Sequence, residues 1–385
     1  MSLITTTSEL SAFIDRLSGE TFVTVDTEFI REKTYWPRLC LVQLGGSDEA
    51  HCIDPLAKDM DLEPLFALMR NPAILKVFHA ARQDLEIFLH LMGDMPQGLY
   101  DTQIAAMVCG FGESVGYETL VIKLAKAKVD KSMRFTDWAR RPLDKKQLAY
   151  ALGDVTHLRV IYEALRDQLE ASGRTNWVER EMEQIADPGL YLVEPNEAYK
   201  RIKARTKSPK FLTLLKELAA WRERTAQEKD LPRNRVLKDE GLLEVAAHPA
   251  TTPQELLKLR SISKGIAEGP MGRGLIEAVE RAQALPKDQW PQPGQKPDLP
   301  QGLGPVTDLL RVLLKMQCEA EGVAPRLVAS SADLELIAAN DEADVPALSG
   351  WRRELFGEAA LKLKRGEMAL ALTPDLTGLR LIPVE

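Results

Sequence analysis

The chain has 385 residues, of which 45% are apolar and 28% charged, and its formal net charge is −7. This length exceeds one ordinary hydrophobic core, so we expect two or three domains, and the acidic balance excludes a large uniformly basic surface. No apolar run reaches the ~18 residues of a membrane span, the N-terminus lacks signal-peptide features, and the four cysteines are scattered. We therefore expect a monomeric, cytoplasmic protein with reduced thiols and no membrane contact.

The N-terminal half alternates patterns typical of strands and helices. Strands are predicted at residues 21–29, 39–44, 51–54 and 74–79. Helices are predicted at residues 61–69, 81–91, 118–127 and 145–171. Early strands joined by turns, followed by strand–helix alternation, favour an α/β domain with a mixed sheet flanked by helices at residues 1–195.

Strand patterns end near residue 190, where a basic connector at 199–210 carries six Lys or Arg and no acid. A Pro- and Gly-rich linker at 285–305 then separates two helical stretches. Segment 323–337 echoes segment 231–245 as a Pro-Arg turn followed by a capped helix, which indicates a weak internal repeat. We predict two small all-α helical-bundle domains, at residues 208–288 and 305–375.

Asp26 and Glu28 lie two residues apart on a predicted strand, so their side chains face the same side. Two carboxylates there repel each other and lose hydration, which a divalent cation with oxygen ligands would relieve. An exposed edge strand with hydrated acids explains this pair equally well.

Asp84 falls on the apolar stripe that Ile87 and Phe88 form in its predicted helix. A carboxylate on that stripe needs a partner or an ion, although an acid in a first helical turn is also favoured by the helix dipole. Tyr150 and Asp154 are neighbours one turn apart on the long helix. This tyrosine could orient a metal-bound water, or the pair could form a plain surface hydrogen bond.

The ordered set of motifs resembles the DEDD exonucleases of the ribonuclease-H-like fold and, among them, ribonuclease D. The first, second and third motifs are VDTEF at 25–29, QDLEIF at 83–88 and YALGDV at 150–155. YDTQIAA at 100–106 and DWARRPL at 137–143 are further features of this resemblance. Ala149, where the other subclass has His, indicates the tyrosine subclass. Residues 208–288 resemble the HRDC domain of RecQ-type helicases and ribonuclease D, and 305–375 looks like a divergent second copy.

The resemblance implies a 3'→5' exoribonuclease that releases 5'-mononucleotides and trims tRNA precursors and other small structured RNAs. It implies two divalent cations, Mg²⁺ or Mn²⁺, and a tyrosine, Tyr150, that orients the attacking water. The implied metal ligands are Asp26, Glu28, Asp84 and Asp154. The supporting residue Asp101 is expected near the site without binding metal.

The resemblance also suggests how RNA reaches this acidic site. Thr27 and Phe29 would pack on the terminal nucleotide, although Phe29 could equally be a core residue. Trp138 could stack on a base, and four cations could line the entrance, namely Lys131, Arg134, Arg140 and Arg141. Hydrated loop charges around a buried tryptophan are the alternative. The RNA backbone would follow residues 200–210 and four arginines of the first helical domain, Arg222, Arg224, Arg233 and Arg235.

Two other functions remain open at this point. A DNA 3'→5' exonuclease would use the same carboxylates, and an RNA-binding scaffold would keep the fold while losing one of them. All four carboxylates and Tyr150 are present. From the linker at 285–305 we also expect a chain that ends near residue 290 to retain hydrolysis of short oligonucleotides.

Overall fold

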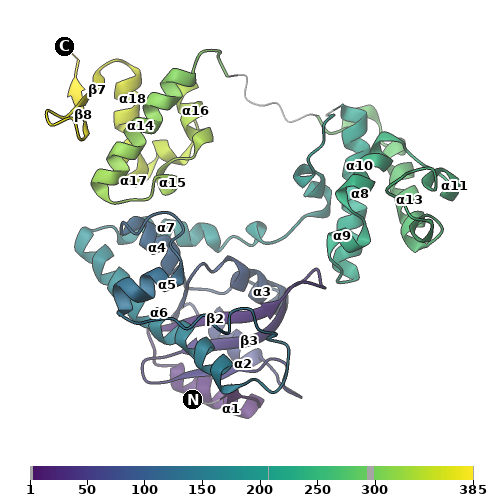
Figure 1. Ribbon diagram of the computed structural model, residues 1–385, viewed down its shortest axis with the longest axis horizontal. Helices are drawn as coiled ribbons and strands as arrows, with labels where there is room; N and C mark the ends of the chain where they lie inside the picture. The colour runs from purple at the N-terminus through teal and green to yellow at the C-terminus, as the bar shows by residue number, and fades with distance from the viewer. Residues whose placement is uncertain (1–2, 207, 293–298, 385) are drawn as a thin grey trace.

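A six-stranded mixed sheet forms the centre of the N-terminal domain (Figure 1). The computed structural model describes residues 3–206, 208–292 and 299–384. The strand order is β1-β4-β3-β2-β5-β6; β2 pairs antiparallel with β3 and β3 with β4, and the other pairs are parallel. The mixed sheet is therefore confirmed, with strands β1 (Leu3–Ile4), β2 (Phe22–Ile30), β3 (Arg38–Gly45), β4 (Ala50–Ile53), β5 (Leu75–Phe78) and β6 (Leu99–Asp101).

Helices cover both faces of this sheet. The side chains of β2 point alternately to one face and to the other, so they contact helices on both sides. Val23 and Val25 face a core shared with three helices, α1 (Thr7–Leu17), α2 (Glu63–Arg70) and α3 (Arg82–Met92). On the other face, Thr24 Oγ1 donates to the carbonyl oxygen of Val155 at 2.9 Å, on helix α6 (Lys145–Ser172). A Cβ at Gly45 would lie 2.6 Å from Thr24 Oγ1, so glycine permits this close crossing of α6.

Helix α6 begins and ends at strong local signals. The Asp144 side chain accepts from the backbone N–H of Gln147, whose own side chain accepts from the Asp144 N–H. The helix ends at Gly173, whose φ of 67° is left-handed. Shorter helices complete the domain, namely α4 (Thr102–Val108), α5 (Tyr117–Leu120), the π-helical turn η1 (Val121–Ala125) and α7 (Thr175–Ile185).

The first helical domain has a hydrophobic core of its own. Ala198 and Ile202 already belong to this core, so the packing begins before residue 208. Its elements are η2 (Pro188–Leu190), η3 (Pro195–Arg201), α8 (Pro209–Glu228), α9 (Arg233–Val236), α10 (Asp239–Ala247), α11 (Pro253–Leu256), α12 (Lys264–Ala267), α13 (Pro270–Ala284) and η4 (Lys287–Gln289).

The loop between β2 and β3 joins this domain to the N-terminal domain. The backbone N–H groups of Tyr35 and Trp36 donate to Asp230 Oδ1 at 3.0 and 2.9 Å. The Tyr35 hydroxyl donates to Glu223, and the Trp36 ring stacks on His90 with centroids 4.2 Å apart. These contacts tie the C-terminal end of α8 to the loop between β2 and β3.

The second helical region repeats the opening of the first. Helices α14, α15 and α16 have 18, 4 and 9 residues, and α8, α9 and α10 have 20, 4 and 9. This repetition supports the internal repeat inferred from the sequence. Its elements are α14 (Gly304–Glu321), α15 (Pro325–Val328), α16 (Ser331–Ala339), η5 (Pro346–Leu348), α17 (Gly350–Arg352), η6 (Arg353–Gly357) and α18 (Glu358–Lys364).

A two-stranded hairpin that the sequence analysis did not anticipate follows α18. Strand β7 (Met368–Leu372) pairs antiparallel with β8 (Leu379–Pro383), which lies beyond the predicted domain end at 375. Both strands are short and only half-buried, so their alternation between apolar and polar residues is weak.

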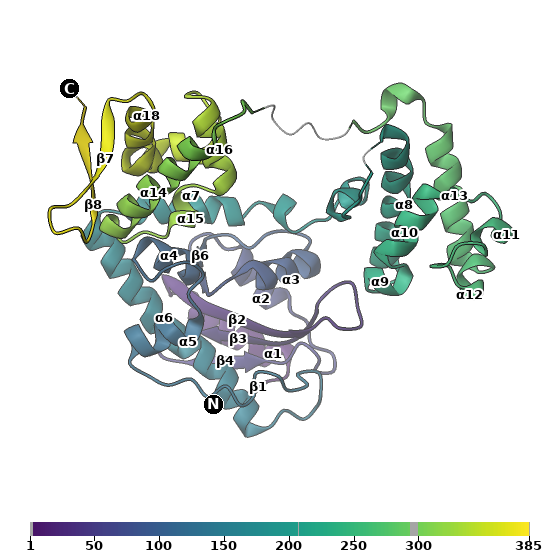
Figure 2. The ribbon, with the colours of Figure 1, turned by 45° about the horizontal axis from the view of Figure 1, so that its top comes forward.

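The second helical region shares one hydrophobic core with the N-terminal domain (Figure 2). The rings of Trp177 on α7 and Trp351 on α17 stack with centroids 4.2 Å apart at 7°. Arg352 forms an ion pair with Glu181 in the same interface. The two regions therefore fold against each other, unlike the independent module that the linker suggested. Among the helices of the described residues, none is long and apolar enough to cross a membrane.

Candidate active site

Three carboxylates from two elements converge at the end of β2. One oxygen each of Asp26, Glu28 and Asp154 can be chosen so that all lie within 4.8 Å of one another. Asp26 and Glu28 share the face of β2 that α6 crosses, and Asp154 is the residue before Val155, to which Thr24 donates. The cluster lines a pocket of about 620 Å³. The sequence-predicted pair on the strand is thus completed by the helix that covers it.

The carboxylates of this cluster hold protons more tightly than usual. Burial raises the pKa of Glu28 to about 9, and the neighbouring Asp26, Asp154 and Asp84 add to the rise. Burial, followed by the charge of Asp154, also raises the pKa of Asp26, and burial raises the pKa of Asp154 to about 7. Within the part of the chain that the structure describes, none of the three forms an ion pair with Lys or Arg.

These properties fit a divalent cation. Clustered carboxylates without a bonded cation are stabilised by a positive ion, and an all-oxygen donor set suits hard ions rather than zinc. Asp84 belongs to a separate position on α3, where it is 7% exposed and accepts a hydrogen bond from the Thr27 hydroxyl. Burial and then the charge of Asp26 raise its pKa. Three of the four predicted carboxylates therefore form the close cluster, with Asp84 beside it.

Tyr150 lines the same pocket one helical turn before Asp154. Burial, followed by the charges of Asp154 and Glu28, raises the pKa of Tyr150, so its hydroxyl stays protonated at neutral pH. The hydroxyl of Tyr117 donates to the carbonyl oxygen of Asp154 at 2.6 Å and approaches that of Gly153 at 3.0 Å. Tyr117, which the sequence analysis did not select, thus holds the turn of α6 that presents Asp154.

Comparisons with known proteins agree with this geometry. The 3'-5' exonuclease family model matches residues 1–170, and the HRDC domain model matches residues 211–279. A ribonuclease D of Gluconacetobacter diazotrophicus is 49% identical over 381 residues, covering 99% of this chain and 96% of its own length. The chain belongs to the ribonuclease D family.

Two further relatives support the same family assignment. A ribonuclease D of Zymomonas mobilis is 45% identical over 385 residues, covering 100% of this chain and 99% of its own length. The crystal structure of Escherichia coli RNase D, an exoribonuclease involved in structured RNA processing, matches with a TM-score of 0.82 at 33% identity. It covers 94% of this chain and 98% of its own. As a member of this family, the chain is a 3'→5' exoribonuclease that acts on RNA, and its fold implies divalent metal ions.

Some of the predicted substrate-binding residues line the pocket of the carboxylate cluster, and others lie outside it. Thr27, Phe29, Lys131 and Arg134 line the pocket. Phe29 also packs against the core of the N-terminal domain, and its contact with a terminal nucleotide stays a prediction. Lys131 forms an ion pair with Glu118, another pocket residue. Asp101 accepts from the backbone N–H groups of Ala80, Ala81 and Gln103, which agrees with its expected supporting position.

Trp138 is buried, which argues against the sequence-based prediction that it stacks on a base. Its side chain is 3% exposed and packs in a core with Leu152 and Cys40. Arg141 is also structural, because its guanidinium binds Asp54 through contacts of 2.6 and 2.7 Å. Arg140 is exposed but lies outside the pocket lining. The burial of Trp138 agrees with the alternative interpretation of this residue.

Two of the four arginines assigned to an RNA path have structural partners instead. Arg222 is 5% exposed and binds Asp239 at 2.7 Å, and Arg233 pairs with the buried Glu223. These pairs hold the first helical domain together. Arg224 is partly exposed and Arg235 exposed, and both stay candidates for RNA contact.

The pocket contains two rings that the sequence analysis overlooked. Phe135 lines it with 92% of its surface exposed, and its ring lies 5.3 Å from the Arg134 guanidinium carbon. The signal was an aromatic residue beside a cation in an otherwise polar loop. His79 also lines the pocket, and its Nδ1 lies 3.0 Å from Thr102 Oγ1. Burial lowers the pKa of His79, so its ring is neutral at pH 7.

Without metal, we expect this ribonuclease D to lose stability as the pH rises. In the folded state Glu28 has a pKa of about 9, well above the value of an unfolded glutamate, so between pH 5 and pH 9 the folded state binds more protons. Stability then falls by about 1.4 kcal/mol per pH unit for each such proton. Urea unfolding at pH 6 and pH 8.5 in EDTA measures the slope.

Magnesium should remove most of that slope, because a bound cation replaces the protons of the cluster. Glu28→Gln should flatten it in EDTA, and Glu335→Gln, at an exposed position on α16, should leave it unchanged. If stability fell with pH equally steeply in Glu28→Gln and in the unmodified protein, the raised pKa of Glu28 would not be the cause of the fall.

Proposed function

We propose that the chain removes nucleotides singly from RNA 3' ends, releasing 5'-mononucleotides, and trims tRNA precursors and other small structured RNAs. The observation that supports this most is the convergence of Asp26, Glu28 and Asp154 beside Tyr150 in one pocket. The E. coli relative, which is an exoribonuclease involved in structured RNA processing, supports the substrate class. The proposal includes Mg²⁺ or Mn²⁺ as the cation and a cytoplasmic monomer as the working form.

In the proposed mechanism, bound divalent cations supply Lewis-acid stabilisation of the charge that develops on the scissile phosphate. Asp26, Glu28 and Asp154 would hold them with carboxylate oxygens. Asp84, fixed by the Thr27 hydroxyl, would contribute from the α3 side. The protonated Tyr150 hydroxyl would orient the attacking water towards the phosphate.

A 3'-extended precursor tRNA tests this function directly. With Mg²⁺, the purified protein should shorten the extension in steps of one nucleotide and release 5'-mononucleotides. A 3'-phosphate on the same RNA should block the reaction, because the pocket would receive an extra charge beside its carboxylates. Equal rates on a matched DNA end, or internal cleavage products, would contradict the proposal.

Tyr150→Phe should lower kcat by about 100-fold or more, within the range typical of a positioned acid–base group, and leave KM close to its original value. The reason is that the hydroxyl would act on water while the ring keeps its packing against Trp138. Single-turnover assays on a short oligonucleotide measure both quantities. A normal kcat would remove Tyr150 from the mechanism.

We also propose that Phe135 takes the stacking role first assigned to Trp138. Its ring is exposed at the pocket, and base–aromatic stacking contributes about 1–3 kcal/mol per base. Phe135→Ala should therefore raise KM for RNA by roughly 5- to 150-fold while changing kcat little. Phe135→Trp should restore the KM.

An RNA with an abasic 3' residue is the matched control for this prediction. Because such an end has no ring to stack, Phe135→Ala should have little effect on its KM. A similar loss on the normal and the abasic ends would show that Phe135 acts through the shape of the loop.

The helical domains would guide RNA towards the pocket. The 18-, 4- and 9-residue helices of the C-terminal region support its interpretation as a divergent second HRDC-type domain at 305–375. Arg224 and Arg235 of the first such domain, at 208–288, would contact the RNA backbone as mobile cations.

A further inference from the structure

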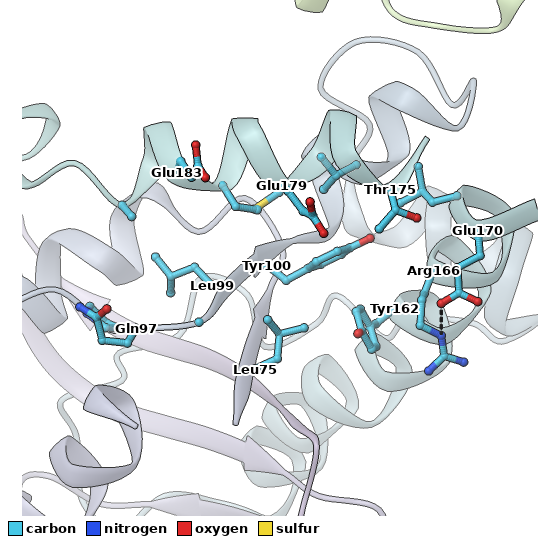
Figure 3. A pocket seen from close by; sticks show the side chains of 16 residues that line it. Leu75, Gln97, Leu99, Tyr100, Tyr162, Arg166, Glu170, Thr175, Glu179 and Glu183 are labelled. Carbon is cyan, nitrogen blue, oxygen red and sulfur yellow. Dashed lines mark ion pairs between the residues drawn. The ribbon is translucent and has the colours of Figure 1, made fainter. Parts of the chain in front are cut away.

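A second pocket, with a volume of about 450 Å³, lies away from the active site (Figure 3). It is enclosed by the sheet edge at β6, the C-terminal half of α6 and one side of α7. The active-site pocket uses the N-terminal half of α6 and shares no lining residue with this one. The proposed nuclease function therefore leaves this pocket unexplained.

The floor of this second pocket is apolar and aromatic. The rings of Tyr100 and Tyr162 meet edge to face, with centroids 4.9 Å apart at 85°, and Leu99 and Met182 extend the apolar wall. The hydroxyl oxygen of Tyr100 is buried and has no hydrogen-bond partner among the described residues. Because neighbouring side chains cover this oxygen, Tyr100 adds its ring to the apolar floor and no polar contact.

The rim of the pocket is acidic. Glu179 and Glu183 lie one turn apart on α7 above Tyr100 and Leu99 (Figure 3), and Glu170 lies near the end of α6. Neither Glu179 nor Glu183 has an ion pair within the described ranges. Arg166 is the cation of the lining, and it already contacts Asp167 at 2.8 Å and Glu170 at 3.9 Å.

This combination selects against nucleic acid and for an organic cation. Phosphates would meet three carboxylates, so the pocket cannot extend the RNA path. Its size and its apolar walls with few polar groups are typical of small-molecule sites.

We propose that this pocket binds a small amine with an apolar, preferably aromatic, body. The apolar body lies against Tyr100, Tyr162 and Met182. The ammonium group lies at the rim between Glu179 and Glu183.

Three matched probes test this assignment on the full chain: 4-phenylbutylamine, 4-phenylbutanol and 4-phenylbutyrate. Binding is measured by ligand-observed NMR titration without RNA. The amine should bind best, the alcohol more weakly, and the carboxylate at least about tenfold more weakly than the amine, since one ion-pair term of about 1.4 kcal/mol is tenfold. A carboxylate that binds as tightly as the amine would overturn the proposal.

Pocket variants separate this site from adventitious binding. The double substitution Glu179→Gln and Glu183→Gln should weaken the amine about tenfold and leave the alcohol unchanged. Ala186→Phe, at the partly exposed end of the lining, should block all three probes, and Glu335→Gln should alter none.

RNA hydrolysis by each variant reports whether the protein is folded, because these residues lie outside the active-site pocket. Failure of the amine to bind an active protein, or unchanged binding in active Ala186→Phe, would overturn the amine site and leave the nuclease proposal intact. If the unmodified protein did not hydrolyse RNA, that result would contradict the proposed nuclease function and would leave the amine site untouched.

Discussion

Replacing Asp26 with Asn should lower kcat/KM on a 3'-extended RNA by about 1000-fold or more, the size expected when several kcal/mol of transition-state stabilisation by metal ions is lost. The same substitution should raise the melting temperature of the metal-free protein. Burial and the charge of Asp154 raise the pKa of Asp26, so its ionised form is costly in the folded state. Asparagine has nearly the same shape but is neutral. It therefore removes the cost of burying an ionised carboxylate, and it removes one ligand of the cation at the same time.

Asp48→Asn is the matched control for this prediction, because Asp48 is an exposed acid in the turn between β3 and β4. It should change neither activity nor melting temperature. The decisive measurement determines kcat/KM and the melting temperature of the metal-free protein on the same preparation. If Asp26→Asn lost activity and also lost stability, the loss would reflect damage to the fold instead of removal of a metal ligand.

A chain that ends near residue 290 should lose hydrolysis of short oligonucleotides as well as of long RNA. The linker at 285–305 suggested the opposite, namely that the C-terminal region is a detachable module. In the structure, Leu310 and Leu313 of α14 and Val178 of α7 belong to one buried core. Removal of the C-terminal region would expose the N-terminal half of that core, including the face of α7 that carries Glu181.

Two matched leucine substitutions test this coupling without a truncation. Leu313 and Leu218 are both 0% exposed, but Leu313 lies in the shared core and Leu218 in the separate core of the first helical domain. Each change to Ala should cost about 2–5 kcal/mol. Hydrogen exchange should show faster exchange in α4 and α7 for Leu313→Ala and unchanged exchange there for Leu218→Ala. Equal protection of α7 in both variants would contradict a shared core.

Local spacing predicted the parts of the active site that lie on one element. The two-residue interval of Asp26 and Glu28 places them on one face of β2, and the four-residue interval of Tyr150 and Asp154 places them one turn apart on α6. Neither interval says which face of the sheet a distant helix covers. The close approach at Gly45 and the Thr24–Val155 hydrogen bond decide that, and they bring Asp154 to Asp26.

The sequence did not reveal which side chains are exposed or which charged side chains are paired. Trp138 and Phe135 sit three residues apart in one polar loop, yet one is 3% and the other 92% exposed. Arg141 and Arg222 looked like free cations in the sequence, and each has a carboxylate partner on another element or loop. Such partners are chosen by the fold, because a buried or half-buried charge is tolerated only where a distant group can pair with it.

By itself, the sequence determined the mixed sheet, the helical C-terminal half and the carboxylate motifs, because all of these follow from short-range periodicity and spacing. Only the tertiary structure decided that three carboxylates meet while Asp84 lies beside them, that Phe135 faces the pocket, and that the C-terminal region is joined to the nuclease domain. Those outcomes depend on contacts between residues that lie on different elements far apart in the sequence. The packing of whole elements then sets which side chains are buried and which remain free.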